Sequence, residues 1–273
     1  MRKNRKIILF ILIIGFIVLI YSFIEPFWLR VREAVISSKD VPSAFHGARV
    51  VFVSDIHHGP YFSRDRVKKL VEKINALNPD IVLLGGDYFH RSPKYIEPCF
   101  EELKELNAQE KFAVLGNHDH WESAGLTREC MKNAGIEILD NRAAWIEKDG
   151  ERIKIGGVGD MYEDEQDIEP TIGDVAENNF VMLLSHNPDF AEHIKTKKID
   201  LILSGHTHGG QVTLFGLWAP IIPSVYGQKY RAGIIKTGYT KVIITTGVGT
   251  ITPPVRFFAR PEIILIQLKS ELV

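Results

Sequence analysis

Short apolar runs recur along the chain, and each ends in polar side chains of the kinds that bind metal ions. Five runs share this pattern, at residues 50–53, 81–84, 112–115, 181–184 and 201–203. Because polar residues do not alternate within them, the runs predict strands that are buried on both faces. Polar groups at the ends of such strands meet along one edge of a sheet. The sequence therefore predicts one polar site assembled from five separate segments.

The segments around these runs predict the rest of the architecture. Residues 63–77 carry apolar side chains at helical spacing after Ser63, which is a suitable cap. Other expected elements are a strand within 27–38, helices within 96–106 and 126–133, an acidic loop with a short helix at 161–179, and mostly strands from residue 201 onward. This succession predicts an α/β fold of two sheets flanked by helices.

The N-terminal residues have a different composition. Residues 7–24 are almost entirely apolar and follow four basic residues, and about 20 apolar residues cross a bilayer as a helix. We expect an uncleaved membrane anchor with the catalytic domain on the extracytoplasmic side, although Arg30 and Arg32 on the far flank weaken that orientation. A cleavable signal peptide is the alternative, but no small-x-small cleavage site follows the run.

Composition bounds the remaining possibilities. A chain of 273 residues with 45% hydrophobic residues is long enough for one large core. Its formal net charge of −1 gives no basic excess for binding nucleic acid, so no nucleic-acid partner is expected. The two cysteines, Cys99 and Cys130, do not make a disulfide framework.

The residues at the strand ends define the chemistry of the predicted site. The candidate metal ligands are Asp55, His57, Asp87, Asn117, His186, His206 and His208. Carboxylate and amide oxygens with imidazole nitrogens, and no cysteine, suit Mn, Fe, Zn, Co or Ni. Seven ligands exceed what one four-coordinate ion needs, but they serve two ions if one carboxylate bridges them. Such an ion pair clamps the attacking and leaving oxygens of a phosphoryl centre.

These residues also carry a family resemblance. The ordered blocks are D-x-H at Asp55 and His57, GGD ending at Asp87, GNHD at 116–119, the lone His186, and GHTH at 205–208. They resemble the five blocks of the calcineurin-like metallophosphoesterases, and the resemblance runs from Val50 to the C-terminus. It implies a four-layer αββα sandwich at residues 50–273, after an anchor at 1–26 and a linker with a first strand at 27–49.

The resemblance also implies residue roles. One divalent ion (Mn, Fe or Zn) would be held by Asp55, His57, Asp87 and His208, and the other by Asp87, Asn117, His186 and His206. His118 would face the substrate phosphate as a catalytic residue, and Asp119 would orient it. His58 stands where the family commonly has an aliphatic residue, and we expect it to touch substrate rather than metal. His90, His120 and His193 match no block and are expected to be structural.

The longer strings GHTHGGQV and PPVRFFARPEI are similar to the membrane-associated bacterial branch of that family. Some members of that branch hydrolyse UDP-2,3-diacylglucosamine in lipid A synthesis, which implies a lipid-linked phosphoester or pyrophosphate substrate. A phosphodiesterase for soluble nucleotides and a non-catalytic scaffold are the alternatives. The apolar segment 214–226, broken by Gly216, Pro220 and Pro223, is expected to line an acyl-chain groove, to rest on the bilayer, or to pack over the sheet edge.

Overall fold

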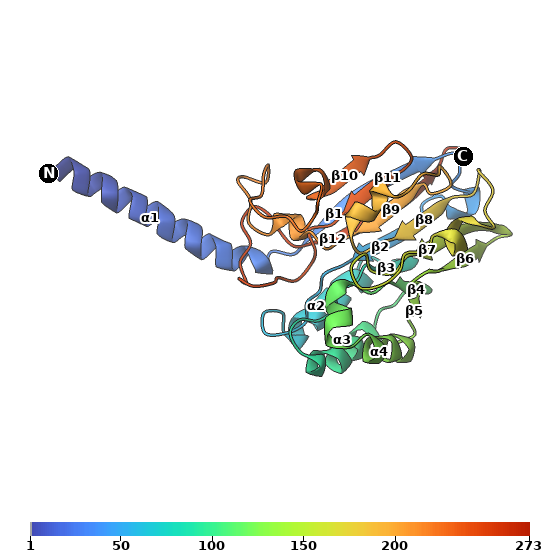
Figure 1. The fold of residues 1–273 in the computed structure, drawn as a ribbon, viewed down its shortest axis with the longest axis horizontal. Helices are drawn as coiled ribbons and strands as arrows, with labels where there is room; N and C mark the ends of the chain where they lie inside the picture. The colour runs from blue at the N-terminus through green and yellow to red at the C-terminus, as the bar shows by residue number, and fades with distance from the viewer. Residues whose placement is uncertain (1) are drawn as a thin grey trace.

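The computed structural model describes residues 2–273 and contains two six-stranded mixed sheets (Figure 1). The first sheet has the order β1 (Arg30–Ser38), β12 (Glu262–Ser270), β2 (Arg49–Val53), β3 (Ile81–Leu84), β4 (Glu110–Ala113) and β5 (Glu137–Ile138). The second has the order β10 (Gly233–Lys236), β11 (Lys241–Ile244), β9 (Leu201–Ser204), β8 (Val181–Leu184), β7 (Glu151–Gly157) and β6 (Arg142–Lys148).

Strand direction brings the polar strand ends together. In the first sheet β2, β3, β4 and β5 are parallel neighbours, and β12 pairs with β2 in the antiparallel sense. In the second sheet β7, β8, β9 and β11 are parallel, with antiparallel strands β6 and β10 at the two edges. The carboxyl ends of β2, β3 and β4 therefore share one sheet edge, as do those of β8 and β9.

The helices are distributed unequally over the two sheets. The outer face of the first sheet packs against α2 (Arg64–Asn75), α3 (Ile96–Leu103) and α4 (Asn117–Asn133). The outer face of the second is covered by short helical segments, including α5 (Glu169–Ile172), η4 (Pro188–Glu192) and η6 (Gly227–Tyr230). The remaining 3-10 segments are η1 (Glu25–Phe27), η2 (Ser43–Phe45), η3 (Pro93–Tyr95) and η5 (His208–Gly210). The α/β prediction is confirmed.

The uniformly apolar strands are explained by a core on each side of the first sheet. In β2, Val51 and Val53 pack toward the helices, whereas Val50 and Phe52 pack into the cluster between the two sheets. Alternate side chains thus enter different cores, so none of residues 50–53 faces water. A third cluster fills the space between the second sheet and its short helices.

Two helix predictions differ in their bounds. The helix expected at 126–133 begins much earlier, at Asn117, and the helix expected at 96–106 ends at Leu103. In α4 the backbone leaves helical geometry at Ser123, with φ −177° and ψ 93°. This kink and the polar first turn interrupt the apolar periodicity on which the sequence prediction relied.

The helix α1 (Arg2–Ile24) projects away from the two sheets (Figure 1). It is long and apolar enough to cross a membrane, and only 6% of its apolar stretch is buried. Its last turn is nevertheless fixed to the body of the protein. The fully buried Glu25 carboxylate accepts hydrogen bonds from the backbone amides of Phe258 and Ala259, both at 2.7 Å. The Arg256 amide donates to the Ser22 carbonyl at 2.9 Å.

Candidate metal centre

All seven predicted ligands lie just after strand ends, and all are buried. Asp55 and His57 follow β2, Asp87 follows β3, Asn117 follows β4, His186 follows β8, and His206 and His208 follow β9. Five of them have left-handed backbone geometry, with φ 55° at Asp55, 47° at His57, 57° at Asp87, 67° at His206 and 51° at His208. Residues other than glycine seldom adopt this conformation, and it concentrates at functional sites. The chain therefore turns sharply after β2, β3 and β9.

One group of ligands joins the first and second sheets. His57 Nε2 lies 3.0 Å from His208 Nε2. Asp55 Oδ1 lies 3.3 Å from His208 Nε2 and 3.9 Å from His57 Nε2. The second group has the same character, because His186 Nε2 lies 3.4 Å from Asp87 Oδ2 and 3.2 Å from His206 Nδ1. Each group brings one carboxylate and two imidazoles to a common point.

Asp87 connects the two groups. Its Oδ2 atom lies 3.4 Å from His186 Nε2 in the second group and 3.5 Å from His57 Nε2 in the first. Its other oxygen, Oδ1, accepts a hydrogen bond from the His118 amide at 2.9 Å. One carboxylate oxygen therefore faces both groups, as a bridging ligand would.

The donor atoms fit divalent metal ions. Asn117 Oδ1 is buried without a hydrogen-bond partner among the described residues, which is costly for an amide oxygen unless a ligand meets it. His186 Nδ1 lies 2.7 Å from the Gly85 carbonyl, and donation to that carbonyl leaves Nε2 as the nitrogen facing Asp87. Metal-binding histidines are commonly oriented in this way.

Glycines allow the loops to approach these groups closely. A Cβ atom added to Gly116 would lie 2.3 Å from Asp87 Oδ1, and one added to Gly205 would lie 2.2 Å from Asp55 Oδ2. Any side chain at either position would collide with a carboxylate. Glycine is therefore required at both positions by contact with the site.

Burial and charge set the protonation of the donors. Burial lowers the pKa of His57 and of His208 well below the usual range, so both imidazoles are neutral at pH 7. Burial also acts to lower the pKa of His186, but the carboxylates of Asp87, Asp55 and Asp160 together outweigh it and raise that pKa. Binding of a cation at His186 would therefore displace a proton, as is usual for metal ligands.

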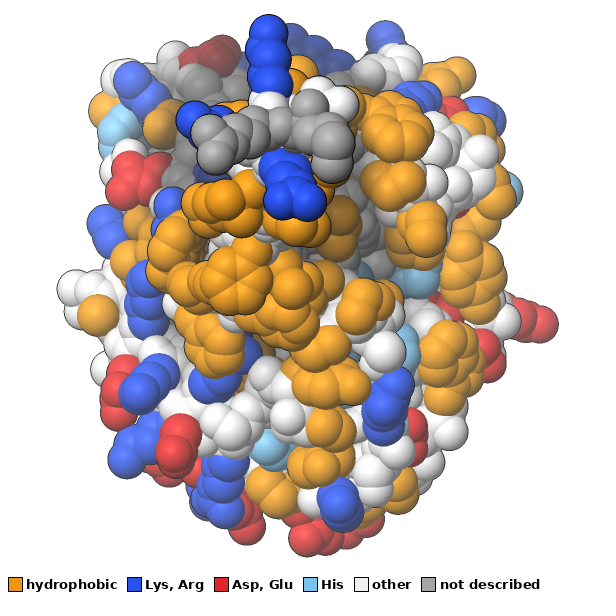
Figure 2. Space-filling model, turned by 90° about the vertical axis from the view of Figure 1, so that its left-hand side faces the viewer, with side chains coloured by type: hydrophobic (Ala, Val, Ile, Leu, Met, Phe, Trp, Pro, Cys, Tyr) orange, Lys and Arg blue, Asp and Glu red, His pale blue; other side chains and the backbone are white. Residues whose placement is uncertain are grey.

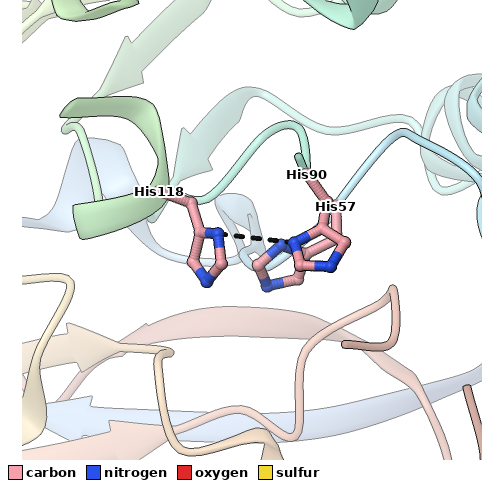
Figure 3. A group of neighbouring side chains, drawn as sticks. All are labelled: His57, His90 and His118. Atoms are coloured by element: carbon pink, nitrogen blue, oxygen red, sulfur yellow. Dashed lines mark hydrogen bonds between the residues drawn. The ribbon is translucent and has the colours of Figure 1, made fainter. Parts of the chain in front are cut away.

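His118 lies beside the first group, at the start of α4. Figure 3 shows its ring turned toward His90 and His57, which come from two loops. His118 Nδ1 is 3.4 Å from His90 Nδ1, and the ring centroids of His118 and His57 are 4.8 Å apart. The sequence interpretation of His90 as a structural residue missed this position, because His90 matches no block and follows no strand directly.

The backbone around His90 explains how it reaches the site. Its amide donates to the His58 carbonyl at 3.0 Å, and residues 58 and 89 form a β-bridge. Its side chain is 7% exposed, and its Nε2 atom has no hydrogen-bond partner among the described residues. Burial, together with the charges of His118 and Arg91, lowers the pKa of His90 to about 4.

None of the hydrogen bonds that Asp119 makes within residues 2–273 is to the imidazole of His118. Its carboxylate accepts from the backbone amides of Asp87, Tyr88 and Gly116 at 2.8, 2.9 and 2.8 Å. It therefore ties the loop after β3 to the start of α4.

The other histidines lie apart from the two groups. His58 Nδ1 is 2.8 Å from the Phe62 carbonyl and its ring packs on Tyr95. His120 Nε2 lies 3.2 Å from the Asp164 carboxylate, and His193 stacks on Phe190. At the rim, the exposed Trp121 packs on His118, and the exposed Tyr162 packs on His206. Sequence analysis did not single out either aromatic residue.

Comparisons with known proteins agree with this geometry. Residues 48–210 match the family model for calcineurin-like phosphoesterases. The uncharacterized metallophosphoesterase YkuE of Bacillus subtilis (strain 168) is 33% identical over 253 residues, which cover 91% of this chain and 88% of that protein. The phosphodiesterase YaeI of Escherichia coli (strain K12) is 30% identical over 251 residues, covering 89% and 90% of the two chains.

The fold is also found among solved structures. The NAD nucleotidase NadN of Haemophilus influenzae superimposes with a TM-score of 0.52 at 15% identity, covering 74% of this chain and 50% of that one. The two sheets and the paired Asp and His groups define the protein as a metal-dependent phosphoesterase. The chain belongs to the calcineurin-like phosphoesterase family.

Proposed function

We propose that the protein uses two divalent ions to hydrolyse a phosphodiester or pyrophosphate bond in a lipid-linked substrate at a membrane. The first ion would be held by Asp55, His57, Asp87 and His208, and the second by Asp87, Asn117, His186 and His206. The observation that carries the two-ion assignment is the placement of Asp87 Oδ2 between both groups of ligands. Manganese, iron and zinc all suit this donor set.

The metal ions, His118 and His90 have different roles in the proposed reaction. When bound, the two ions supply Lewis acidity at the phosphoryl group and lower the pKa of water. His118 lies at the edge of the first ligand group without belonging to it, and it protonates the leaving oxygen. His90 lies against His118, and an imidazole pair at this distance holds the partner ring and fixes which nitrogen carries its proton.

The docking of α1 supports its role as an uncleaved, single-pass anchor. Removal of α1 with η1 would take away the Glu25 carboxylate and leave the amides of Phe258 and Ala259 without their partner. It would also remove Tyr21, whose ring packs on Trp28, Phe257 and Phe258. The basic residues in the first turns of α1 favour a cytoplasmic N-terminus, which puts the catalytic domain on the extracytoplasmic side.

The apolar segment 214–226 supports a lipid substrate. Its side chains are strongly exposed, with Phe215 at 67%, Leu217 at 81% and Ile221 at 77%. Phe215 packs on Phe258, which in turn contacts Tyr21 of α1. Figure 2, which views the face from which α1 projects, shows hydrophobic side chains gathered there. A large exposed apolar surface of this kind is typical of a membrane or lipid contact.

The function is tested with purified full-length protein and two substrates, bis(p-nitrophenyl) phosphate and UDP-2,3-diacylglucosamine in mixed micelles. We expect metal-dependent hydrolysis of both, with a higher kcat/KM for the lipid. If both substrates are still hydrolysed in the presence of a chelator, the metal-dependent mechanism is contradicted. Activity on the soluble ester and on nucleotide pyrophosphates, with none on the lipid, would contradict the lipid assignment and favour the soluble-nucleotide alternative.

Changing Phe215, Leu217 and Trp218 together to serine is expected to separate the two activities. These side chains are remote from the reacting phosphorus, so they contribute binding energy only to a substrate that has acyl chains. We expect kcat/KM for the lipid to fall roughly 10- to 100-fold, because the contact of this segment with an acyl chain is worth about 1.5–3 kcal/mol in total, the value for one fully buried side chain. The soluble ester should be hydrolysed at nearly the original rate. A parallel fall in both activities would show that the segment supports the site structurally.

A further inference from the structure

A cavity of about 380 Å³ lies at the base of α1. None of its lining residues is a proposed metal ligand. Six of the lining residues are charged: Arg30, Arg32, Arg231, Arg260, Glu25 and Glu262. We call this cavity the anchor-base pocket. Its four arginines and two glutamates give an excess of positive charge.

Both carboxylates of the pocket already have partners. Glu262 is 1% exposed and accepts from Arg30 at 2.8 and 3.0 Å and from Arg32 at 3.2 Å. Glu25 accepts two backbone amides. Neither carboxylate is therefore available to neutralise the other two arginines, Arg231 and Arg260.

Arg231 and Arg260 form no ion pair with any residue in the range 2–273. Arg231 Nη2 donates to the Gly216 carbonyl at 2.7 Å, and Arg260 Nε donates to the Trp28 carbonyl at 3.1 Å. Each guanidinium has five N–H groups, so these single bonds leave several donors for a ligand. Two planar guanidinium groups with open donors at one cavity suit an anion with several oxygens, and phosphate matches their geometry best.

The surroundings of the pocket identify the source of the phosphate. Its wall includes Tyr21, from the last turns of α1, and the exposed ring of Phe258. Tyr21 and Trp28 flank the end of the apolar helix, where aromatic residues mark the boundary between hydrocarbon and head groups. If α1 spans a bilayer, the pocket lies at head-group depth with an apolar wall toward the acyl chains. Figure 2 shows Lys and Arg side chains beside the hydrophobic ones on this face.

We propose that the anchor-base pocket binds the phosphate of an anionic phospholipid head group through Arg231 and Arg260. The proposal rests on α1 being an uncleaved anchor, but not on the identity of the hydrolysed substrate. A lipid held there would fix the rotation of the catalytic domain about α1, and with it the direction in which the metal centre faces the membrane.

The test is native mass spectrometry of the full-length protein in detergent, titrated with phosphatidylglycerol or phosphatidylcholine. We expect one phosphatidylglycerol to be retained in preference to phosphatidylcholine. Arg231→Gln combined with Arg260→Gln should lower that retention roughly 30-fold, because each arginine near an anionic head group increases the affinity about fivefold. Arg30 and Arg32 are left unchanged, since their loss would leave the buried Glu262 carboxylate without an ion-pair partner.

The matched control is Arg142→Gln with Arg152→Gln, which removes the same charge from β6 and β7 at the opposite end of the molecule (Figure 1). It should retain phosphatidylglycerol like the wild type. Arg231→Lys with Arg260→Lys keeps the charge and should keep a preference for phosphatidylglycerol. Equal retention of phosphatidylglycerol by the glutamine variant and the wild type, or no preference over phosphatidylcholine in the wild type, would overturn the proposal.

Two further outcomes are distinguished in the same experiment. Glycerol 1-phosphate is added as a soluble competitor. If it displaces the lipid at equal concentration, the pocket binds a soluble phosphate rather than a lipid head group. The intact mass reports whether α1 is present, and a chain that lacks it would overturn the anchor and this site together. Hydrolysis of bis(p-nitrophenyl) phosphate by the glutamine variant should match the wild type, so a failure of the enzymatic proposal is seen separately.

Discussion

Replacing Asp87 by alanine is expected to remove both metal ions and lower turnover by ~10³-fold or more, because metal ions contribute several kcal/mol to phosphoryl transfer. Asp87 Oδ2 faces His57 in one ligand group and His186 in the other, so its loss affects both. Asn117→Ala removes a ligand from the second group alone and should mainly weaken that ion. Metal content is measured by elemental analysis after reconstitution and dialysis.

The control for this comparison is Asp65→Ala, which removes an exposed carboxylate from the first turn of α2 and should keep both metals and full activity. Circular dichroism checks that each variant is folded. An Asp87→Ala protein that retains two tightly bound ions would show that Asp87 does not bridge them.

Replacing His118 by alanine is expected to keep both ions and lower turnover by ~10²–10⁴-fold, the usual contribution of a general acid. The loss should be larger for an alkyl leaving group than for p-nitrophenolate, because a poor leaving group depends more on protonation. Steady-state kinetics over a series of leaving groups measures this dependence. Equal losses across the series would remove His118 from the role of acid.

The same series tests His90. His90→Leu removes the nitrogen that lies 3.4 Å from His118 Nδ1, and it should reproduce part of the leaving-group dependence seen for His118→Ala. His90→Asn offers an amide group near the same position and should restore most of the activity. The double variant His90→Leu, His118→Ala should be no slower than His118→Ala alone, since residues that act as a unit are not additive. Independent, additive losses would contradict the pairing.

The positions of the seven ligands follow from a simple rule of strand order. Each lies at the carboxyl end of a buried strand, and the parallel strands bring these ends to one edge of each sheet. The pattern of apolar runs was therefore sufficient to predict that Asp55 and Asp87 lie near one another, whereas His206 reaches them because the second sheet packs against the first. The two-sheet α/β fold followed from the same runs.

Other features depend on contacts that no local pattern records. His90 reaches the site because a β-bridge between residues 58 and 89 folds its loop back toward His118. Glu25 lies just after an apolar helix, yet its partners are more than 230 residues away at Phe258 and Ala259. The anchor-base pocket combines Arg30 with Arg231, which are likewise distant in the sequence. Such tertiary contacts leave no periodic signal.

The assignment of roles to Asp119 shows a similar limit. The family resemblance implied that Asp119 orients the side chain of His118. The structure shows a carboxylate that accepts three backbone amides and joins two loops. The resemblance named the residue but not the backbone amides that its carboxylate meets, because these come from two separate loops.

The central claim is that two divalent ions lie on either side of Asp87. Anomalous diffraction from crystals of the full-length protein equilibrated with Mn²⁺ tests it most directly. The account predicts two anomalous peaks that share Asp87, one beside Asp55, His57 and His208, and the other beside Asn117, His186 and His206. A single peak at saturating Mn²⁺, or two peaks that do not both contact Asp87, would contradict it.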